Sequence, residues 1–183
     1  MSVRQSLLAI LDQGDCYGSQ LRAEYTRRTG ATVNVGQIYT TLERLARDGL
    51  VENLGADDEG RILWGLTAAG RVETRAWLAA PSPGEGRDDL AARVALAVTL
   101  PGADVSGILS AQRAAFRAEL AAPALDDGAT DAAARAVVRA ARRERLEAGL
   151  RWLDEVERIV EGAVPFGLAA DRPRRGRPVR SVV

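Results

Sequence analysis

Residues 34–52, NVGQIYTTLERLARDGLVE, decide the fold of this chain. Read at helical spacing, one side of the stretch is apolar or small: Ile38, Leu42, Leu45 and Gly49. The opposite side is polar: Gln37, Thr40, Arg44 and Arg47. Asn34 with Gln37 forms a capping-box pattern, and Gly49 suits a left-handed helix end. The stretch therefore predicts a short amphipathic helix followed, at Leu50-Val51, by a strand.

The polar side of this helix has the chemistry that the DNA major groove accepts. Arginine and glutamine side chains can read base edges there, and hydroxyl groups can bind phosphates. The alternative is an ordinary amphipathic surface helix, because most polar helix faces are simply solvated. The rest of the chain has to decide between these two interpretations.

Composition places the chain among soluble globular proteins. It has 183 residues, of which 46% are hydrophobic and 27% charged, enough for one domain or two small ones. No apolar run is long enough to cross a bilayer, and residues 1–12 lack a signal-peptide cleavage pattern, so we expect no membrane contact. The single cysteine, Cys16, cannot form an internal disulfide, which fits a cytoplasmic location.

The formal net charge of zero hides an uneven distribution. Residues 1–80 hold 9 Arg against 10 acidic residues, residues 81–170 hold 11 against 14, and residues 171–183 hold 5 against 1. Bulk charge therefore does not favour nucleic-acid binding by the first half of the chain. Any affinity for DNA has to come from local placement of arginines and from two copies acting together.

Residue types needed for catalysis are missing. The chain has no His, which removes the commonest general base and metal ligand, and its lone Cys lacks a base partner. There is no phosphate-binding glycine loop and no metal-ligand spacing, and the acidic run at residues 57–60 is typical of a solvated hairpin tip. We expect no enzyme activity, catalytic residue, metal or cofactor.

The order of elements predicts a winged helix-turn-helix in residues 1–80. Helices are expected at residues 3–13, with Ser2 and Gln5 as a capping box, and at 18–28, before the helix already described. Strands at 50–54 and 61–66 with a turn-rich connection form the wing, and a helix follows at 68–80.

The second part, residues 84–164, is helical in pattern, with helices expected at 89–100, 104–122 and 130–162. The last has a long apolar stripe that two short neighbours cannot cover, so a second copy of the chain is the expected partner. The alternative is an intrachain helical hairpin. Residues 165–183 read as a disordered Arg-rich tail, either solvated or attracted to DNA phosphates. The predicted fold class is mainly α: a winged helix-turn-helix domain and an all-α dimerisation domain.

The runs LLAILDQGDCYGSQL, NVGQIYTTLERLARDGLVE and RILWGLTAAGR resemble the PadR family of bacterial transcriptional regulators. The motifs that carry the resemblance are Gly18, Gly36-Gln37-Ile38-Tyr39, Asp48-Gly49-Leu50-Val51 and Leu66-Thr67-x-x-Gly70. The resemblance covers residues 3 to about 80, with Ser19 and Val35 departing from the family pattern. It implies a homodimer that binds a partly palindromic, double-stranded operator, usually as a repressor released by a small, often aromatic compound.

Position by position, the resemblance implies DNA contacts by Gln37, Tyr39, Thr40 and Arg44. Gln37 and Arg44 suit base edges, and the hydroxyl groups of Thr40 and Tyr39 suit phosphates. Tyr39 could equally be half-buried, bracing its helix against the preceding one. Tyr17 could hold a phosphate, and Arg61 at the wing base could reach the minor groove or merely balance the acidic wing tip.

An aromatic effector would be expected to stack on aromatic rings, and the chain has three tryptophans: Trp64, Trp77 and Trp152. Trp152 lies beside the predicted dimer stripe, yet tryptophan at helical spacing is more often core packing. Two other function classes stay open. One is a winged-helix module that binds proteins without binding an operator, and the other is a ligand-binding helical dimer without a DNA role.

Overall fold

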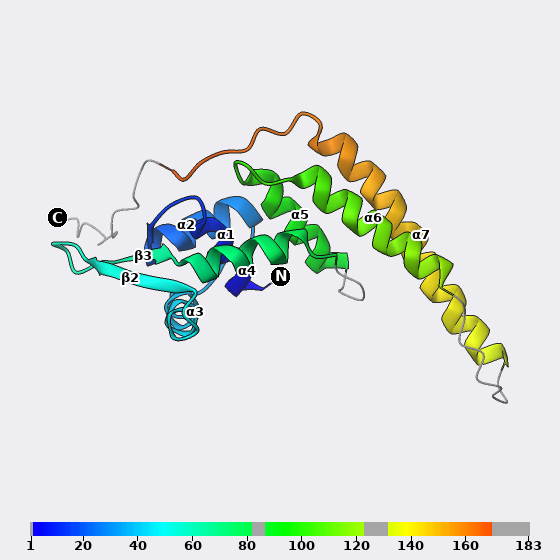
Figure 1. Ribbon diagram of the computed structural model, residues 1–183, viewed down its shortest axis with the longest axis horizontal. Coiled ribbons are helices and arrows are strands. Elements are labelled where there is room, and N and C mark those ends of the chain that lie inside the picture. Colours follow the sequence, from blue (N-terminus) through cyan, green and yellow to red (C-terminus); the bar gives the residue numbers. More distant parts are fainter. Residues whose placement is uncertain (1, 82–86, 123–131, 170–183) are drawn as a thin grey trace, which may run out of the picture. The chain divides into compact units, whose positions relative to one another are not determined.

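The computed structural model describes residues 2–81, 87–122 and 132–169 (Figure 1). Its helices are α1 (Val3–Leu11), α2 (Gly18–Thr29), α3 (Val35–Arg47), α4 (Ala68–Ala79), α5 (Arg87–Thr99), α6 (Val105–Ala121) and α7 (Ala132–Val160). Its strands are β1 (Cys16–Tyr17), β2 (Val51–Ala56) and β3 (Ile62–Leu66). The mainly α fold class is confirmed.

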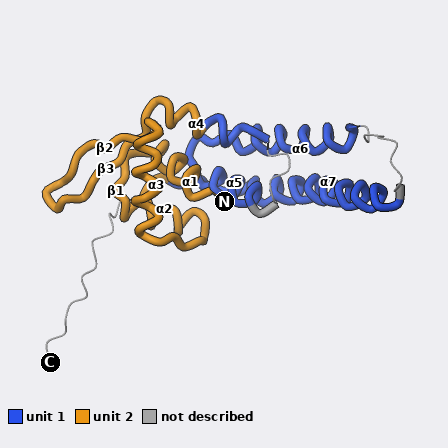
Figure 2. Tube along the Cα trace, turned by 90° about the horizontal axis from the view of Figure 1, so that it is seen from below, with its two compact units in different colours: residues 1, 75–166 blue, residues 2–74, 167–183 orange. Residues whose placement is uncertain are grey.

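The chain forms two compact units, shown in different colours in Figure 2. Of the described residues, the winged unit comprises 2–74 with 167–169, and the helical unit comprises those within 75–166. The division falls inside α4, ahead of the domain boundary that the sequence suggests at residues 81–83. Residues 82–86 lie outside the described part, so the boundary itself stays a prediction.

The winged unit has its core between α1, α2 and α3. The largest side chains that are fully buried there are leucines and isoleucines: Leu7, Leu8, Ile10, Leu11, Leu21, Ile38, Leu42 and Leu45. The apolar side predicted for α3 is thus the side that is buried. Three antiparallel strands in the order β1-β3-β2 complete the unit, with Cys16 opposite Trp64 and Val51 opposite Leu66. Strand β1 was not predicted, because two residues show no alternation.

The ends of α3 follow the sequence signals. The Asn34 side chain accepts a hydrogen bond of 2.8 Å from the Gly36 N–H, which satisfies a free donor at the helix start. Gly49 has φ of +74°, the left-handed conformation predicted for it. The capping box predicted for α1 is wrong, because the Ser2 side chain makes no capping hydrogen bond and Gln5 instead donates to Glu73.

The start of α4 packs closely against the end of α3. The Thr67 hydroxyl donates to the Gly49 carbonyl at 2.7 Å and accepts from the Gly70 N–H at 3.1 Å. A Cβ atom at Gly70 would lie 2.1 Å from the Leu50 carbonyl oxygen, far inside contact distance. The Leu-Thr-x-x-Gly run therefore caps α4 and lets its first turn approach the chain where α3 passes into the wing.

The helical unit packs α5, α6 and α7 around a separate apolar core. Its buried members are Leu90, Val94, Ala97, Ile108, Leu109, Leu153 and Val156. Helices α6 and α7 lie side by side (Figure 2), with the Phe116 ring against Gly149 and Arg113 paired with Asp154 and Glu157 at 2.8 and 2.9 Å. Leu146, Leu153 and Val156 belong to the apolar stripe of the predicted helix at residues 130–162, and all three are buried within one chain. The intrachain hairpin is thus formed, and a dimer stays a prediction.

The predicted tail, residues 165–183, is only partly described. Residues 165–169 are described, and the Phe166 N–H donates to the Thr99 carbonyl. The Arg-rich residues from 170 onward lie outside the described part, so their predicted disorder is not tested. Within the helices that the structure describes, none is long and apolar enough to span a membrane.

Candidate nucleic-acid interface

Helix α3 is held by its apolar side and by the turn that precedes it. Val33 in this turn is buried, and its carbonyl oxygen accepts a hydrogen bond of 3.0 Å from Nε of Arg22 on α2. With the apolar side buried by the core, the orientation of α3 about its own axis is set. The opposite side must then face outward.

That outward side is the polar one predicted from the sequence. Gln37, Thr40, Arg44 and Arg47 are all exposed. The hydroxyl of the half-buried Thr41 is bonded to the Gln37 carbonyl at 2.6 Å. The structure thus brings Gln37, Thr40 and Arg44 together on one surface, and it adds Arg47, a member of the polar side that was not predicted as a DNA contact.

The arginines of the winged unit differ in whether their guanidinium groups have an ion-pair or hydrogen-bond partner. Residues 2–74 contain eight arginines. Five of them form ion pairs with carboxylates of the same unit: Arg4, Arg27, Arg28, Arg61 and Arg71. Arg22 donates to the Val33 carbonyl. Among residues 2–74, Arg44 and Arg47 are left without an ion pair or side-chain hydrogen bond to any described residue, and both lie on α3.

Tyr39 lies at the edge of this surface with its ring against Gly18 at the start of α2. The side chain is 39% exposed, and a Cβ atom at Gly18 would lie 2.8 Å from Cε1 of the ring. This contact explains why the motif has glycine at position 18. The position of Tyr39 fits the bracing alternative better than a hydroxyl extended toward a phosphate.

Tyr17 and Arg61 form a second cluster, at the base of the wing. The Arg61 guanidinium pairs with Asp57 at 2.6 Å and Glu59 at 3.3 Å, and it lies 4.8 Å above the centre of the Tyr17 ring. The hydrogen bond from Arg61, helped by the backbone N–H groups of Arg61 and Glu59, lowers the pKa of Asp57 to about 2. Tyr17 itself is buried. Arg61 therefore balances the acidic wing tip, as the second interpretation of this residue required.

The three tryptophans do not share one environment. Trp64 is buried in the sheet of the winged unit, whereas Trp77 and Trp152 are half-buried in the helical unit. Trp152 packs against the apolar core of that unit. The sequence-based expectation that a tryptophan binds an effector stays a prediction, with Trp64 the least accessible of the three.

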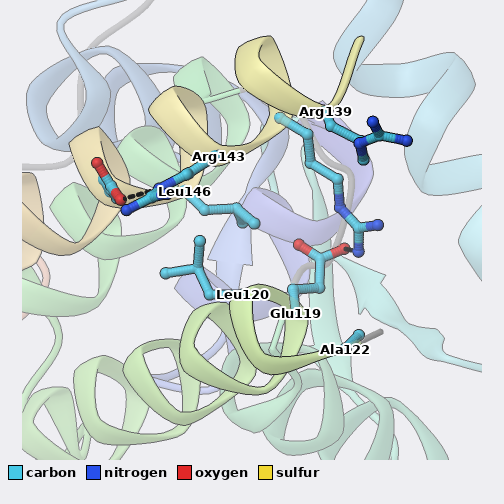
Figure 3. Close-up of a pocket in the computed structure, with 8 residues that line it drawn as sticks. Glu119, Leu120, Ala122, Arg139, Arg143 and Leu146 are labelled. Atoms are coloured by element: carbon cyan, nitrogen blue, oxygen red, sulfur yellow. Dashed lines mark hydrogen bonds and ion pairs between the residues drawn. The ribbon is translucent and has the colours of Figure 1, made fainter. Parts of the chain in front are cut away.

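A cavity that no sequence signal indicated lies between α6 and α7 (Figure 3). Its volume is about 350 Å³, and its lining residues are Glu119, Leu120, Ala122, Arg139, Arg142, Arg143, Leu146 and Glu147. Two ion pairs form among its lining residues, Arg142 with Glu119 at 3.5 Å and Arg143 with Glu147 at 2.7 Å. In sequence these arginines look like the solvated side of a helix, so only the packing of two helices reveals the cavity.

No cluster of three or more His, Cys, Asp or Glu suited to a metal ion is found in residues 2–81, 87–122 and 132–169. Cys16 is buried as a free thiol.

Comparison with known proteins finds a family model that matches the first part of the chain. The model of the transcriptional regulator PadR-like family matches residues 7–76. No curated protein sequence matches the chain.

Solved structures with a similar chain course include a PadR family transcription regulator from Clostridium difficile R20291, at 23% identity and a TM-score of 0.37 over 41% of this chain and 81% of that one. Bacillus subtilis PadR in complex with operator DNA is 18% identical, with a TM-score of 0.39 over 85% of this chain and 96% of that one. A PadR-like regulator from Bacillus cereus is 18% identical, with a TM-score of 0.38 over 86% and 95%.

Proposed function

We propose, because residues 7–76 match the model of the PadR-like family of transcriptional regulators, that the chain is a cytoplasmic, dimeric repressor that binds a partly palindromic operator. A small aromatic effector releases it from DNA. The outward surface of α3, with its two unpaired arginines, is the observation that carries the proposal.

The chemistry of that surface supports direct recognition of bases. Arg44 can form two hydrogen bonds to a guanine edge, and Gln37 can do the same with adenine. Thr40 and Arg47 suit phosphates on either side of the groove. Since Arg44 and Arg47 have no acidic partner in the described part of the chain, neither has to break an ion pair before it meets DNA.

A dimer is needed because one short helix reads only a few base pairs. Two copies of α3 would enter major grooves about 34–36 Å apart, one turn of the duplex. Apolar side chains that α7 leaves exposed, Val137, Val138 and Ile159, supply material for contact with a second copy. For the effector, Trp152 and Trp77 are the proposed stacking residues, because both are half-buried and so partly accessible.

The proposal is tested by titrating the full chain into duplex DNA from upstream of its own gene, at several salt concentrations. We expect specific binding that weakens steeply between low and moderate salt, with protection of two half-sites about one turn apart. Binding to a protein partner that barely responds to salt, with no preference for operator DNA, would support the interaction-module alternative.

Oligomeric state and effector binding need separate measurements. Light scattering should give twice the chain mass at micromolar concentration, and a monomer would remove the dimer from the proposal. Planar aromatic acids and dyes should quench tryptophan fluorescence and release the operator together. The substitution Trp152→Phe should remove most of that quenching, whereas Trp64→Phe, at the buried position, serves as the matched control.

A further inference from the structure

The buried side of α7 changes character along the helix. From residue 146 onward, four positions are buried at alternating spacings of three and four residues: Leu146, Gly149, Leu153 and Val156. This spacing is the pattern of a helix-packing seam. Counting back from Leu146 by the same alternation reaches Arg142 and then Arg139. Two guanidinium groups thus occupy positions where the rest of the seam has apolar or small residues.

The cavity between α6 and α7 lies where the seam changes from leucine to arginine. Arg139 and Arg142 line it together with Leu120 and Leu146. Figure 3 shows the two leucine side chains pointing toward one another from the two helices. Because a guanidinium group packed among apolar groups without a partner is costly, the arginines cannot close the seam as leucines do. What is left is a space of about 350 Å³ with both apolar and cationic walls.

The cationic wall has more positive charge than the carboxylates of the cavity neutralise. Three arginines and two glutamates line the cavity. Arg143 is paired with Glu147 at 2.7 Å. Arg142 lies 3.5 Å from Glu119, which is longer than an ordinary N–H···O hydrogen bond. Arg139 forms no ion pair or side-chain hydrogen bond with any residue that the structure describes. Because a guanidinium has five N–H donors, Arg139 and Arg142 keep donors for an added anion.

We propose that this cavity binds a short aliphatic carboxylate, with its anionic head on Arg139 and Arg142 and its hydrocarbon chain against Leu120 and Leu146. A carboxylate matches the fork of a guanidinium group, which can donate two parallel hydrogen bonds to it. None of the eight lining residues is aromatic, so the walls favour the packing of an aliphatic chain over the stacking of a flat ring. The site is distinct from the tryptophans proposed above for an aromatic effector, and it does not require that the chain bind DNA.

The ligand class is tested by following the amide chemical shifts of the full-length chain by NMR while hexanoate is added, without DNA. We expect saturable shifts at the residues of α6 and α7 that line the cavity. Hexanamide, the neutral analogue, should bind roughly 5-fold more weakly, because it lacks the charge that the arginines attract. Acetate should also bind more weakly than hexanoate, by up to about 4-fold for each methylene that it lacks. Equal affinities for hexanoate and hexanamide, or for hexanoate and acetate, overturn the proposal.

The assigned residues are tested by Arg139→Gln, with Arg151→Gln as the matched control. Both arginines are exposed on α7 and both changes remove one positive charge, but Arg151 does not line the cavity. Arg139→Gln should weaken hexanoate binding by roughly 2- to 5-fold, the range for an exposed ion pair, and Arg151→Gln should leave it unchanged. Leu120→Ser should bring the affinity for hexanoate closer to that for acetate.

Thermal melting checks that the three variants fold. Equal hexanoate affinities for the two folded arginine variants overturn the proposal, as do shifts that cluster at Trp77 and Trp152 instead of at the cavity. Since neither experiment contains DNA, the proposed function stands or falls separately, on the operator titration.

Discussion

Helix α3 and the wing both present arginines at positions where a winged helix can meet DNA, yet the two regions differ in what surrounds those arginines. Arg44 and Arg47 on α3 have no carboxylate partner in the described part of the chain. Arg61 at the wing base is paired with Asp57 and Glu59 and stacks over Tyr17. We therefore expect the guanidinium groups of Arg44 and Arg47, and not that of Arg61, to be available to DNA.

The comparison also accounts for the proposed DNA binding by a chain with no net charge. Most arginines of the winged unit are in ion pairs, such as Arg4 with Glu73 and Asp48, and Arg71 with Asp12. Exposed ion pairs of this kind add little stability but neutralise the charge locally. Within residues 2–74, the arginines that remain for DNA are concentrated on α3.

The largest expected effect comes from disrupting the close packing of α4 against Leu50, where α3 passes into the wing. The substitution Gly70→Ala places a Cβ atom 2.1 Å from the Leu50 carbonyl, which forces the backbone apart. We expect a loss of roughly 3 kcal/mol in the free energy of unfolding, at the upper end for overpacking, measured by urea denaturation. The control is Ala76→Gly on the exposed side of α4, which should cost about 1 kcal/mol. Equal losses would show that the approach of Gly70 to Leu50 does not matter.

The next effect compares the two regions directly. Arg44→Ala should reduce discrimination between operator and scrambled DNA by roughly 1–3 kcal/mol, or about 5- to 150-fold, because it removes a base contact. Arg61→Ala should leave discrimination unchanged, since its guanidinium is already paired. Competition binding measures both. If the two variants lose discrimination equally, the pairing of Arg61 does not decide its role.

A smaller effect should follow from freeing Arg61. Changing Asp57 to Asn and Glu59 to Gln removes both charges while the Asn side chain can still accept the backbone N–H groups. The released guanidinium should add one phosphate contact and steepen the logarithmic salt slope of DNA binding by about 0.9. Adding Arg61→Gln to this double variant should return the salt slope to the wild-type value. If the slope stays steeper, the change is due to the loss of acidic repulsion and not to Arg61.

The smallest effect concerns the pKa of Asp57 at the tip of the wing. Asp57 has a pKa of about 2, so any stability from its ion pair is present above the ordinary value of 3.8 and is lost as pH falls through about 2. Arg61→Gln should raise the Asp57 pKa toward 3.8, though backbone N–H donors keep it somewhat lower. Carboxyl chemical shifts followed by NMR from pH 1 to 6 measure this, and an unshifted pKa in the wild type would contradict the pairing.

Sequence reasoning predicted much of the fold because helix periodicity and caps are local signals. Helix α3 and the wing strands lie within two residues of their predicted bounds, and Gly49 has the left-handed conformation expected where α3 ends. The polar side of α3 was also predictable, since the apolar residues of an amphipathic helix indicate which side is buried.

Sequence alone thus determined the order of helices and strands, the burial pattern of α3 and the resemblance of the N-terminal region to a known family. Tertiary structure decided which arginines are free, that Tyr39 lies on Gly18, that α6 and α7 pack within one chain, and that Gly167 and Ala169 are hydrogen-bonded to α2. These features join residues far apart in the chain, or depend on where one side chain points. They produce no periodic pattern along the sequence, and so only the folded chain reveals them.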